Sequence, residues 1–217
     1  MKLVFEQILV GGDRNFGYLF GDREAGVAAI IDPSYQPELL IERAKSQNLK
    51  VQWIINTHSH NDHTNGNEKA KQLTGAEIAA HKSSPVSHDL SLEDGEQLKI
   101  GDFHLKVFHT PGHCEDHIVL FNPEHHIALT GDHLFVGKIG GTGNEETSKQ
   151  QWGALNRLFE ELPEETTIWP GHNYGCRPSS TLALERACNP FLRSEDFPEF
   201  LKMKQTWSTY KAEMGLL

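Results

Sequence analysis

The chain has 217 residues, 37% of them hydrophobic and 23% charged, which is enough for one globular domain with a sizeable core. Its formal net charge of −10 excludes sequence-independent nucleic-acid binding, which needs clustered lysine and arginine, and disfavours docking on anionic membranes. The amino terminus lacks the apolar region of a signal peptide, no stretch is long enough to span a membrane, and the three cysteines fit a reducing compartment, so we expect a cytoplasmic protein.

Short β-type runs alternate with helical stretches along the chain. In chain order we predict a strand at 26–31, a helix at 38–47, a strand at 51–56, a helix at 67–73, strands at 103–108, 118–121 and 127–130, a helix at 151–162 and a strand at 166–169. From about Ser179 the sequence reads as helical to its end, with interruptions at Asn189-Pro190 and Phe197-Pro198. The pattern predicts an α/β or α+β protein with a catalytic core over 1–175 and a short helical C-terminal extension over 176–217 packed on it.

A dense cluster of metal-binding side chains follows the predicted strand at 51–56. Within six residues the chain carries His58, His60, Asp62 and His63. Unpaired imidazoles and a carboxylate packed this closely would repel one another on protonation and would cost desolvation energy if buried. A divalent cation removes both problems, because it binds neutral imidazole and carboxylate. The spacing therefore predicts a metal site.

Three further β-type runs end in small-residue turns that carry a histidine or an aspartate: His113, Asp132 and His172. Active sites on layered α/β scaffolds lie on loops at strand ends, so we expect these turns to meet the first cluster in a two-metal pocket. We assign three ligands to each metal: His58, His60 and His113 to the first, and Asp62, His63 and His172 to the second. Asp132 bridges the two, as a carboxylate can between cations roughly 3.5–4 Å apart.

The order and spacing of these segments resemble the metallo-β-lactamase superfamily, over most of the chain to about residue 175. The resemblance implies a four-layer αββα sandwich with the metal site at one edge, between the two sheets. Within that superfamily the chain looks like the glyoxalase II group, because residues 131–136 resemble the GDxLFV segment of those enzymes and residues 171–174 resemble their GHxY. In that group the tyrosine, here Tyr174, helps to hold the glutathione part of the substrate. Lys138, in a glycine-rich stretch, is a candidate contact for an anionic substrate.

Two functions remain open. A hydrolase would use two divalent metal ions (zinc, iron or a mixed pair) to bring the pKa of a bridging water towards ~7, and the hydroxide would attack a thioester such as an acyl-glutathione. Asp62 and Asp132 are the catalytic candidates, and the leaving thiol, with an ordinary pKa of about 8.5, departs as thiolate.

The alternative is a persulfide dioxygenase acting on glutathione persulfide, with one Fe(II) on His58, His113 and Asp132. The short tail is closer to that branch, whereas the GDxLFV and HxY segments favour the hydrolase, which we prefer. Lactone hydrolysis is a further alternative. In each case we expect a small-molecule substrate, with a homodimer as an open possibility. His117 is predicted to hydrogen-bond near the site rather than to bind metal, and Cys114 to be a small buried thiol rather than a nucleophile.

Overall fold

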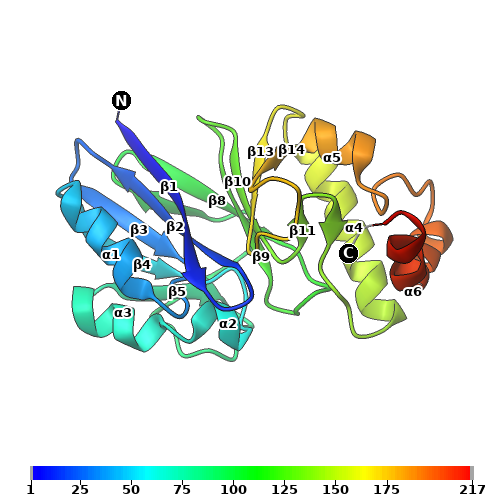
Figure 1. Cartoon of the computed structure of the whole chain (residues 1–217). Helices are drawn as coiled ribbons and strands as arrows, with labels where there is room; N and C mark the ends of the chain where they lie inside the picture. The colour runs from blue at the N-terminus through cyan, green and yellow to red at the C-terminus, as the bar shows by residue number, and fades with distance from the viewer. Residues whose placement is uncertain (1, 216–217) are drawn as a thin grey trace.

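The computed structural model describes residues 2–215 of the chain. Two six-stranded sheets pack face to face, and helices cover the outer side of each (Figure 1). The first sheet has the strand order β1-β2-β3-β4-β5-β6, and the second has the order β14-β13-β10-β9-β8-β7. The predicted four-layer αββα sandwich is confirmed.

The first half of the chain builds the first sheet and its helices. Its elements are β1 (Leu3–Gly11), β2 (Asn15–Asp22), β3 (Val27–Ile31), α1 (Pro37–Ser46), β4 (Lys50–Ile55), α2 (Asn61–Thr64), α3 (Asn67–Thr74), β5 (Glu77–His81) and β6 (Leu90–Leu92). Strands β1, β2 and β3 form an antiparallel meander, and β3 to β6 run parallel. Helices α1 and α3 pack on the outer face through Leu40, Ile41 and Ala70.

The second half builds the second sheet, which is antiparallel except for the parallel pair β10–β13, and the helices that cover it. Its elements are β7 (Gln97–Ile100), β8 (Phe103–His109), β9 (Ile118–Asn122), β10 (Ile127–Gly131), β11 (Leu134–Phe135), β12 (Lys138–Ile139), α4 (Glu145–Glu161), β13 (Thr167–Pro170), β14 (Ser180–Thr181), α5 (Leu182–Cys188) and α6 (Phe197–Glu213). Helix α4 covers the outer face through Leu155 and Leu158, and Phe200 of α6 joins the same apolar cluster.

The main core lies between the two sheets, and strand β2 shows why. All eight of its residues are buried, because one side faces the other sheet and the other side faces α1. Phe16, Tyr18 and Phe20 point into the inter-sheet core, whereas Leu19 belongs to the cluster beneath the helices. Strands covered on both faces lose the alternation of apolar and polar residues.

The helical predictions need three corrections. Helix α4 begins at Glu145, six residues before the predicted start, because Asn144 and Thr147 form a capping box in front of a polar first turn. In the tail, residues 180–181 pair with β13 as an edge strand instead of forming helix. Pro198 lies in the first turn of α6 behind the N-cap Asp196, where its missing N–H costs nothing, so it starts a helix and does not interrupt one. The last two residues of the predicted extension lie outside the described residues.

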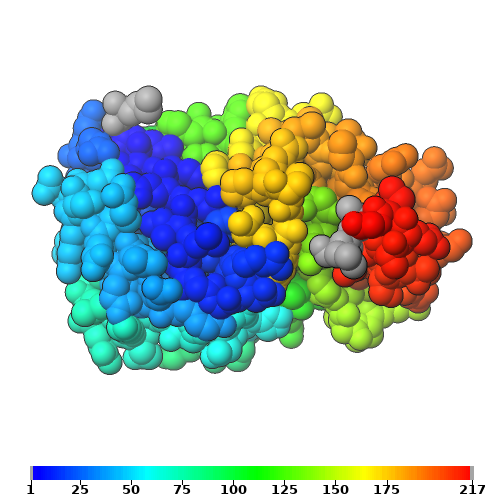
Figure 2. Space-filling model, in the orientation of Figure 1, coloured from blue at the N-terminus to red at the C-terminus, as the bar shows by residue number. Residues whose placement is uncertain are grey.

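Four strand ends meet at one edge of the sandwich. The loops that follow β4, β8, β10 and β13 converge there, and the turn between β1 and β2 joins them. Backbone hydrogen bonds run from Phe16 N to Gly171 O and from Asn173 N to Arg14 O, both 2.9 Å. Figure 2 shows the segment after β13 lying against this N-terminal hairpin. Within residues 2–215, no helix has both the length and the apolar character that crossing a bilayer requires.

Candidate metal centre

The loop after β4 is held by a buried aspartate at the end of β3. Asp32 Oδ1 accepts a hydrogen bond from the backbone N–H of Thr57 (2.8 Å), and Asp32 Oδ2 accepts one from the Thr57 hydroxyl (2.7 Å). The same Oδ2 lies 3.0 Å from Nδ1 of His63. Asp32 therefore fixes both the start of the loop and the ring of a predicted ligand one turn later.

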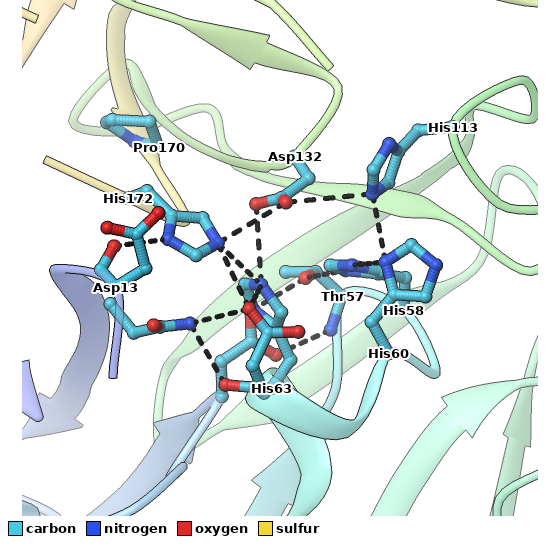
Figure 3. A network of polar contacts seen from close by, with 12 residues as sticks. Asp13, Thr57, His58, His60, His63, His113, Asp132, Pro170 and His172 are labelled. Atoms are coloured by element: carbon cyan, nitrogen blue, oxygen red, sulfur yellow. Dashed lines mark hydrogen bonds and ion pairs between the residues drawn. The ribbon is translucent and has the colours of Figure 1, made fainter. Parts of the chain in front are cut away.

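The structure brings the three predicted ligands of the first metal together. Nδ1 of His60 lies 3.1 Å from Nε2 of His58 and 3.0 Å from Nε2 of His113 (Figure 3). His58 is buried and His60 is exposed, so the cluster opens to solvent on one side. Three imidazole nitrogens meeting at these distances are spaced like the ligands of one cation.

The three predicted ligands of the second metal also converge. Nε2 of His63 lies 3.2 Å from Nε2 of His172. Oδ2 of Asp62 lies 3.3 Å from Nε2 of His172 and 3.7 Å from Nε2 of His63. The amide nitrogen of Asn15 donates to the Asp62 carboxylate (3.1 Å) and to the Asp62 carbonyl oxygen (3.0 Å). Asn15 is buried in the β1–β2 hairpin. This hairpin therefore orients Asp62, a predicted ligand in the segment that follows β4 of the same sheet.

Asp132 lies between the two clusters, as Figure 3 shows. Its Oδ1 is 3.4 Å from Nε2 of His63, and its Oδ2 is 3.4 Å from Nε2 of His172 and 3.6 Å from Nε2 of His113. It contacts ligands of both predicted metals, which is the placement expected of a bridging carboxylate.

The two clusters differ in their electrostatics. Burial lowers the pKa of His63 and of His172, but the nearby Asp132 outweighs burial and holds the pKa of His63 well above, and that of His172 above, the usual value. Burial raises the pKa of Asp132, but the surrounding His63 and His172 outweigh this and hold the pKa well below its usual value, so the carboxylate is ionised. Burial lowers the pKa of His58 well below its usual value and lowers that of His113, so these rings are neutral and can offer a lone pair. Oδ1 of Asp132 is buried and has no hydrogen-bond partner within residues 2–215. Buried orphan acceptors beside converging imidazoles are satisfied by a bound cation.

Each of the five candidate histidines has a partner for its outward-facing ring nitrogen. His58 Nδ1 lies 3.1 Å from the Thr57 hydroxyl, His113 Nδ1 2.8 Å from the Gly141 carbonyl oxygen and His172 Nδ1 2.9 Å from the Asp13 carbonyl oxygen. His63 has Asp32, as described above. The fifth pair joins His60 Nε2 to Cys114 Sγ at 3.1 Å. Metal-binding histidines almost always donate their second ring N–H in this way.

The two predicted substrate contacts lie together beside the second cluster. The ring of Tyr174 stacks on His172 with centroids 4.6 Å apart and planes at 6°, and its hydroxyl donates to Asp13 Oδ2 (2.7 Å). Lys138 Nζ lies 4.1 Å from the centroid of the Tyr174 ring, and partial burial lowers the pKa of this amine. Arg14 flanks the same ring at 4.8 Å.

His117 and Cys114 take different positions around the centre. His117 is fully buried, with Nδ1 2.8 Å from the Thr110 hydroxyl and Nε2 accepting from the backbone N–H of Asp132 (3.1 Å), so both of its ring nitrogens have protein partners. Cys114 is only half-buried and lies at the first cluster, and burial raises the pKa of its thiol to about 12. The thiol that was predicted to be buried is therefore partly exposed.

Two close approaches define the walls of the site. A Cβ at Gly171 would overlap Oδ1 of Asp132 and would lie 2.8 Å from Cε1 of His63. A Cβ at Gly140 would overlap the carbonyl oxygen of Asp132. The Gly140 carbonyl in turn accepts a 3.2 Å hydrogen bond from Nζ of Lys204 on α6, so the C-terminal helix contacts the glycine-rich loop over the site.

Sequence reasoning missed Asp32, Asn15 and Asp13. Asp32 follows a buried strand, as the ligand-bearing turns do, so the same rule applied once more would have found it. Asn15 and Asp13 lie in a hairpin that the sequence pattern did not predict, and nothing in their local sequence marks them.

The comparisons with known proteins agree with this geometry. The sequence profile described as the Metallo-beta-lactamase superfamily matches residues 11–172. A hydroxyacylglutathione hydrolase of Maricaulis maris is 33% identical over 84% of this chain and 84% of its own length, and the mitochondrial persulfide dioxygenase ETHE1 of Homo sapiens is 31% identical over 87% and 75%. The crystal structure of ETHE1 from Myxococcus xanthus superposes with a TM-score of 0.86 at 26% identity, covering 94% of this chain and 91% of that one.

Proposed function

Because this chain belongs to the metallo-beta-lactamase superfamily, we propose that it is a metal-dependent hydrolase that cleaves a thioester of glutathione or a similar thiol. The observation that carries the proposal is a pair of clusters with Asp132 between them: His58, His60 and His113 with Cys114 beside them, and Asp62, His63 and His172. When bound there, two divalent cations supply an ionised water and polarise the thioester carbonyl.

The residues of the chain would hold the reactants in place. Asp62 is kept in position by Asn15 and is half-buried at the second cluster, where its carboxylate can accept a hydrogen bond from the attacking water and orient it. Asp132 stays ionised and fixes the distance between the clusters. The leaving thiol has an ordinary pKa of about 8.5 and needs no strong acid to depart.

The side of the site that carries Tyr174 and Lys138 would bind the thiol part of the substrate. The Lys138 ammonium group lies over the aromatic ring, which leaves it partly desolvated. A partly desolvated cation interacts more strongly with a carboxylate than a fully hydrated one. Glutathione carries two carboxylates, so this face suits it.

A second candidate, a persulfide dioxygenase, is favoured by the similarity to the two ETHE1 proteins over most of their length. In that reaction His58, His113 and Asp132 would hold one Fe(II). The remaining four residues would only support them: His60, Asp62, His63 and His172. This chain contains the ligand residues that each reaction needs. The number of bound cations is therefore what would distinguish the hydrolase from the dioxygenase.

The decisive experiment combines metal analysis of anaerobically purified protein with two assays. We expect two metal equivalents per chain and turnover of S-lactoylglutathione. One iron equivalent, with oxygen uptake driven by glutathione persulfide and no thioester turnover, would refute the proposal.

His63→Ala separates the two functions further. The hydrolase loses its second cation and nearly all its activity, whereas the dioxygenase keeps its iron. His81→Ala is the matched control, because His81 is also buried but stacks on His109, away from the ligand clusters.

A further inference from the structure

The partner of His60 differs chemically from those of the other four candidate ligands. His58, His63, His113 and His172 direct their outer nitrogens to a hydroxyl, a carboxylate and two carbonyl groups, all oxygen acceptors. Nε2 of His60 instead faces Sγ of Cys114 at 3.1 Å. Within residues 2–215, this is the one sulfur among the five pairs.

The two ring nitrogens of His60 have distinct surroundings. Nδ1 points to Nε2 of His58 and Nε2 of His113, at 3.1 and 3.0 Å. Nε2 lies across the ring and points to the thiol. When Nδ1 offers its lone pair to a cation, Nε2 carries the proton, and the sulfur is the group placed to accept it.

His60 also depends on this contact more than the other rings depend on theirs. His58, His63 and His172 are buried, so packing alone restricts their rotation, whereas His60 is exposed. An exposed ring is held mainly by its polar contacts, and a rotated ring would no longer present Nδ1 to the first cluster.

We propose that Cys114 is the positioning residue of His60 and that its thiol sets the affinity of the first metal position. The inference rests on the proposed two-metal site, and it makes the first position sensitive to any change at one sulfur atom. The second position is independent of that atom, because its rings are held by Asp32 and by the carbonyl of Asp13.

The test measures metal affinity and does not depend on activity. Full-length apoprotein is titrated with zinc against a chromogenic chelator, for the wild type and for Cys114→Ala, Cys114→Ser and Cys188→Ser. We expect Cys114→Ala to weaken one of two binding events about 10–100-fold, the range for losing the outer partner of a metal-bound histidine. Cys114→Ser should restore most of the affinity, because its hydroxyl oxygen accepts the same hydrogen bond. Cys188 is exposed at the end of α5, so its variant should match the wild type.

X-ray absorption of the zinc-loaded wild type distinguishes a positioning residue from a ligand. Only nitrogen and oxygen neighbours at ~2.0–2.2 Å are expected, and a sulfur neighbour at ~2.3 Å would make Cys114 a ligand and overturn the inference. Equal affinities for wild type and Cys114→Ala would also overturn it, as would a single binding event unaffected by the substitution.

The same protein samples separate this inference from the proposed function. Two binding events that respond to Cys114→Ala, without thioester turnover, would refute the hydrolase and leave the role of Cys114 standing. Thioester turnover with unchanged affinity in Cys114→Ala would refute the role of Cys114 alone.

Discussion

Replacing Asp32 by asparagine should weaken metal binding at the second position without unfolding the protein. The carboxylate accepts three hydrogen bonds, from the Thr57 N–H, the Thr57 hydroxyl and His63 Nδ1. An amide has one oxygen, and the backbone N–H of Thr57 requires it because that group can only donate. The NH₂ group of the new amide side chain would then face His63 Nδ1, which must become an acceptor.

That exchange moves the ring proton of His63 to Nε2, the nitrogen that points to His172 and Asp132. A protonated Nε2 has no lone pair for a cation. A hydrogen bond to a charged group contributes about 1.5–3 kcal/mol, and about 1.4 kcal/mol is a factor of ten, so we expect zinc affinity at the second position to fall about 10–100-fold. The assay is the competition titration with a chelator.

Asp22→Asn is the matched control for this substitution. Asp22 is also fully buried and accepts three hydrogen bonds at 2.8 to 3.2 Å. The donors are the backbone N–H groups of Glu24, Ala25 and Asp102. Asp22 lies at the end of β2 that is away from the candidate metal centre. Both variants should lose about 1–3 kcal/mol of unfolding free energy, and only Asp32→Asn should lose zinc affinity. Equal zinc affinity in the two variants would show that Asp32 does not set the tautomer of His63.

Three further predictions concern the walls of the site, the C-terminal helix and the cation itself. Gly171→Ala should lower the unfolding free energy by about 1–3 kcal/mol and weaken metal binding, because the new methyl group would overlap Asp132 and His63. Gly153→Ala in α4 is the control, because its methyl group would meet open space and should leave stability unchanged or raise it. Comparable denaturation midpoints for the two variants would contradict this prediction. Burial lowers the pKa of Lys204 from 10.5 to about 8, so between those pH values the folded state holds fewer protons than the unfolded state. The unfolding free energy should therefore rise with pH in this range. We expect a rise of about 1 kcal/mol, because solvent screens part of the effect. Urea titrations at about pH 7.5 and about pH 9.5, on either side of that pKa, measure the rise, and Lys204→Met should abolish it. Zinc at about 100 times its Kd should stabilise the apoprotein by about 2.7 kcal/mol, measured as a concentration-dependent Tm, and a Tm independent of zinc would argue against the site.

The strand ends that carry the ligands could be predicted because their chemistry is local. A buried β-run followed by a small residue and His or Asp is visible in the sequence, and all seven predicted ligands lie in the two clusters or between them.

The β1–β2 hairpin could not be predicted in the same way. Gly17 and Gly21 interrupt the apolar pattern of β2, although close packing requires small residues there: a Cβ at Gly17 would lie 2.8 Å from Leu40 of α1. The roles of Asn15 and Asp13 depend on where that hairpin packs, and such long-range contacts leave no local signature.

The division of the ligands between the halves of the chain has a consequence for assembly. All strands of the first sheet come from residues 3–92 and all strands of the second from residues 97–181, so each half of the chain builds one half of the sandwich. His58, His60, Asp62 and His63 belong to one half, and His113, Asp132 and His172 belong to the other. A cation bound by these predicted ligands would join the two halves through its coordinate bonds. Two fragments separated between β6 and β7 should therefore reassociate more tightly when zinc is present, which would make this fold a metal-responsive split protein.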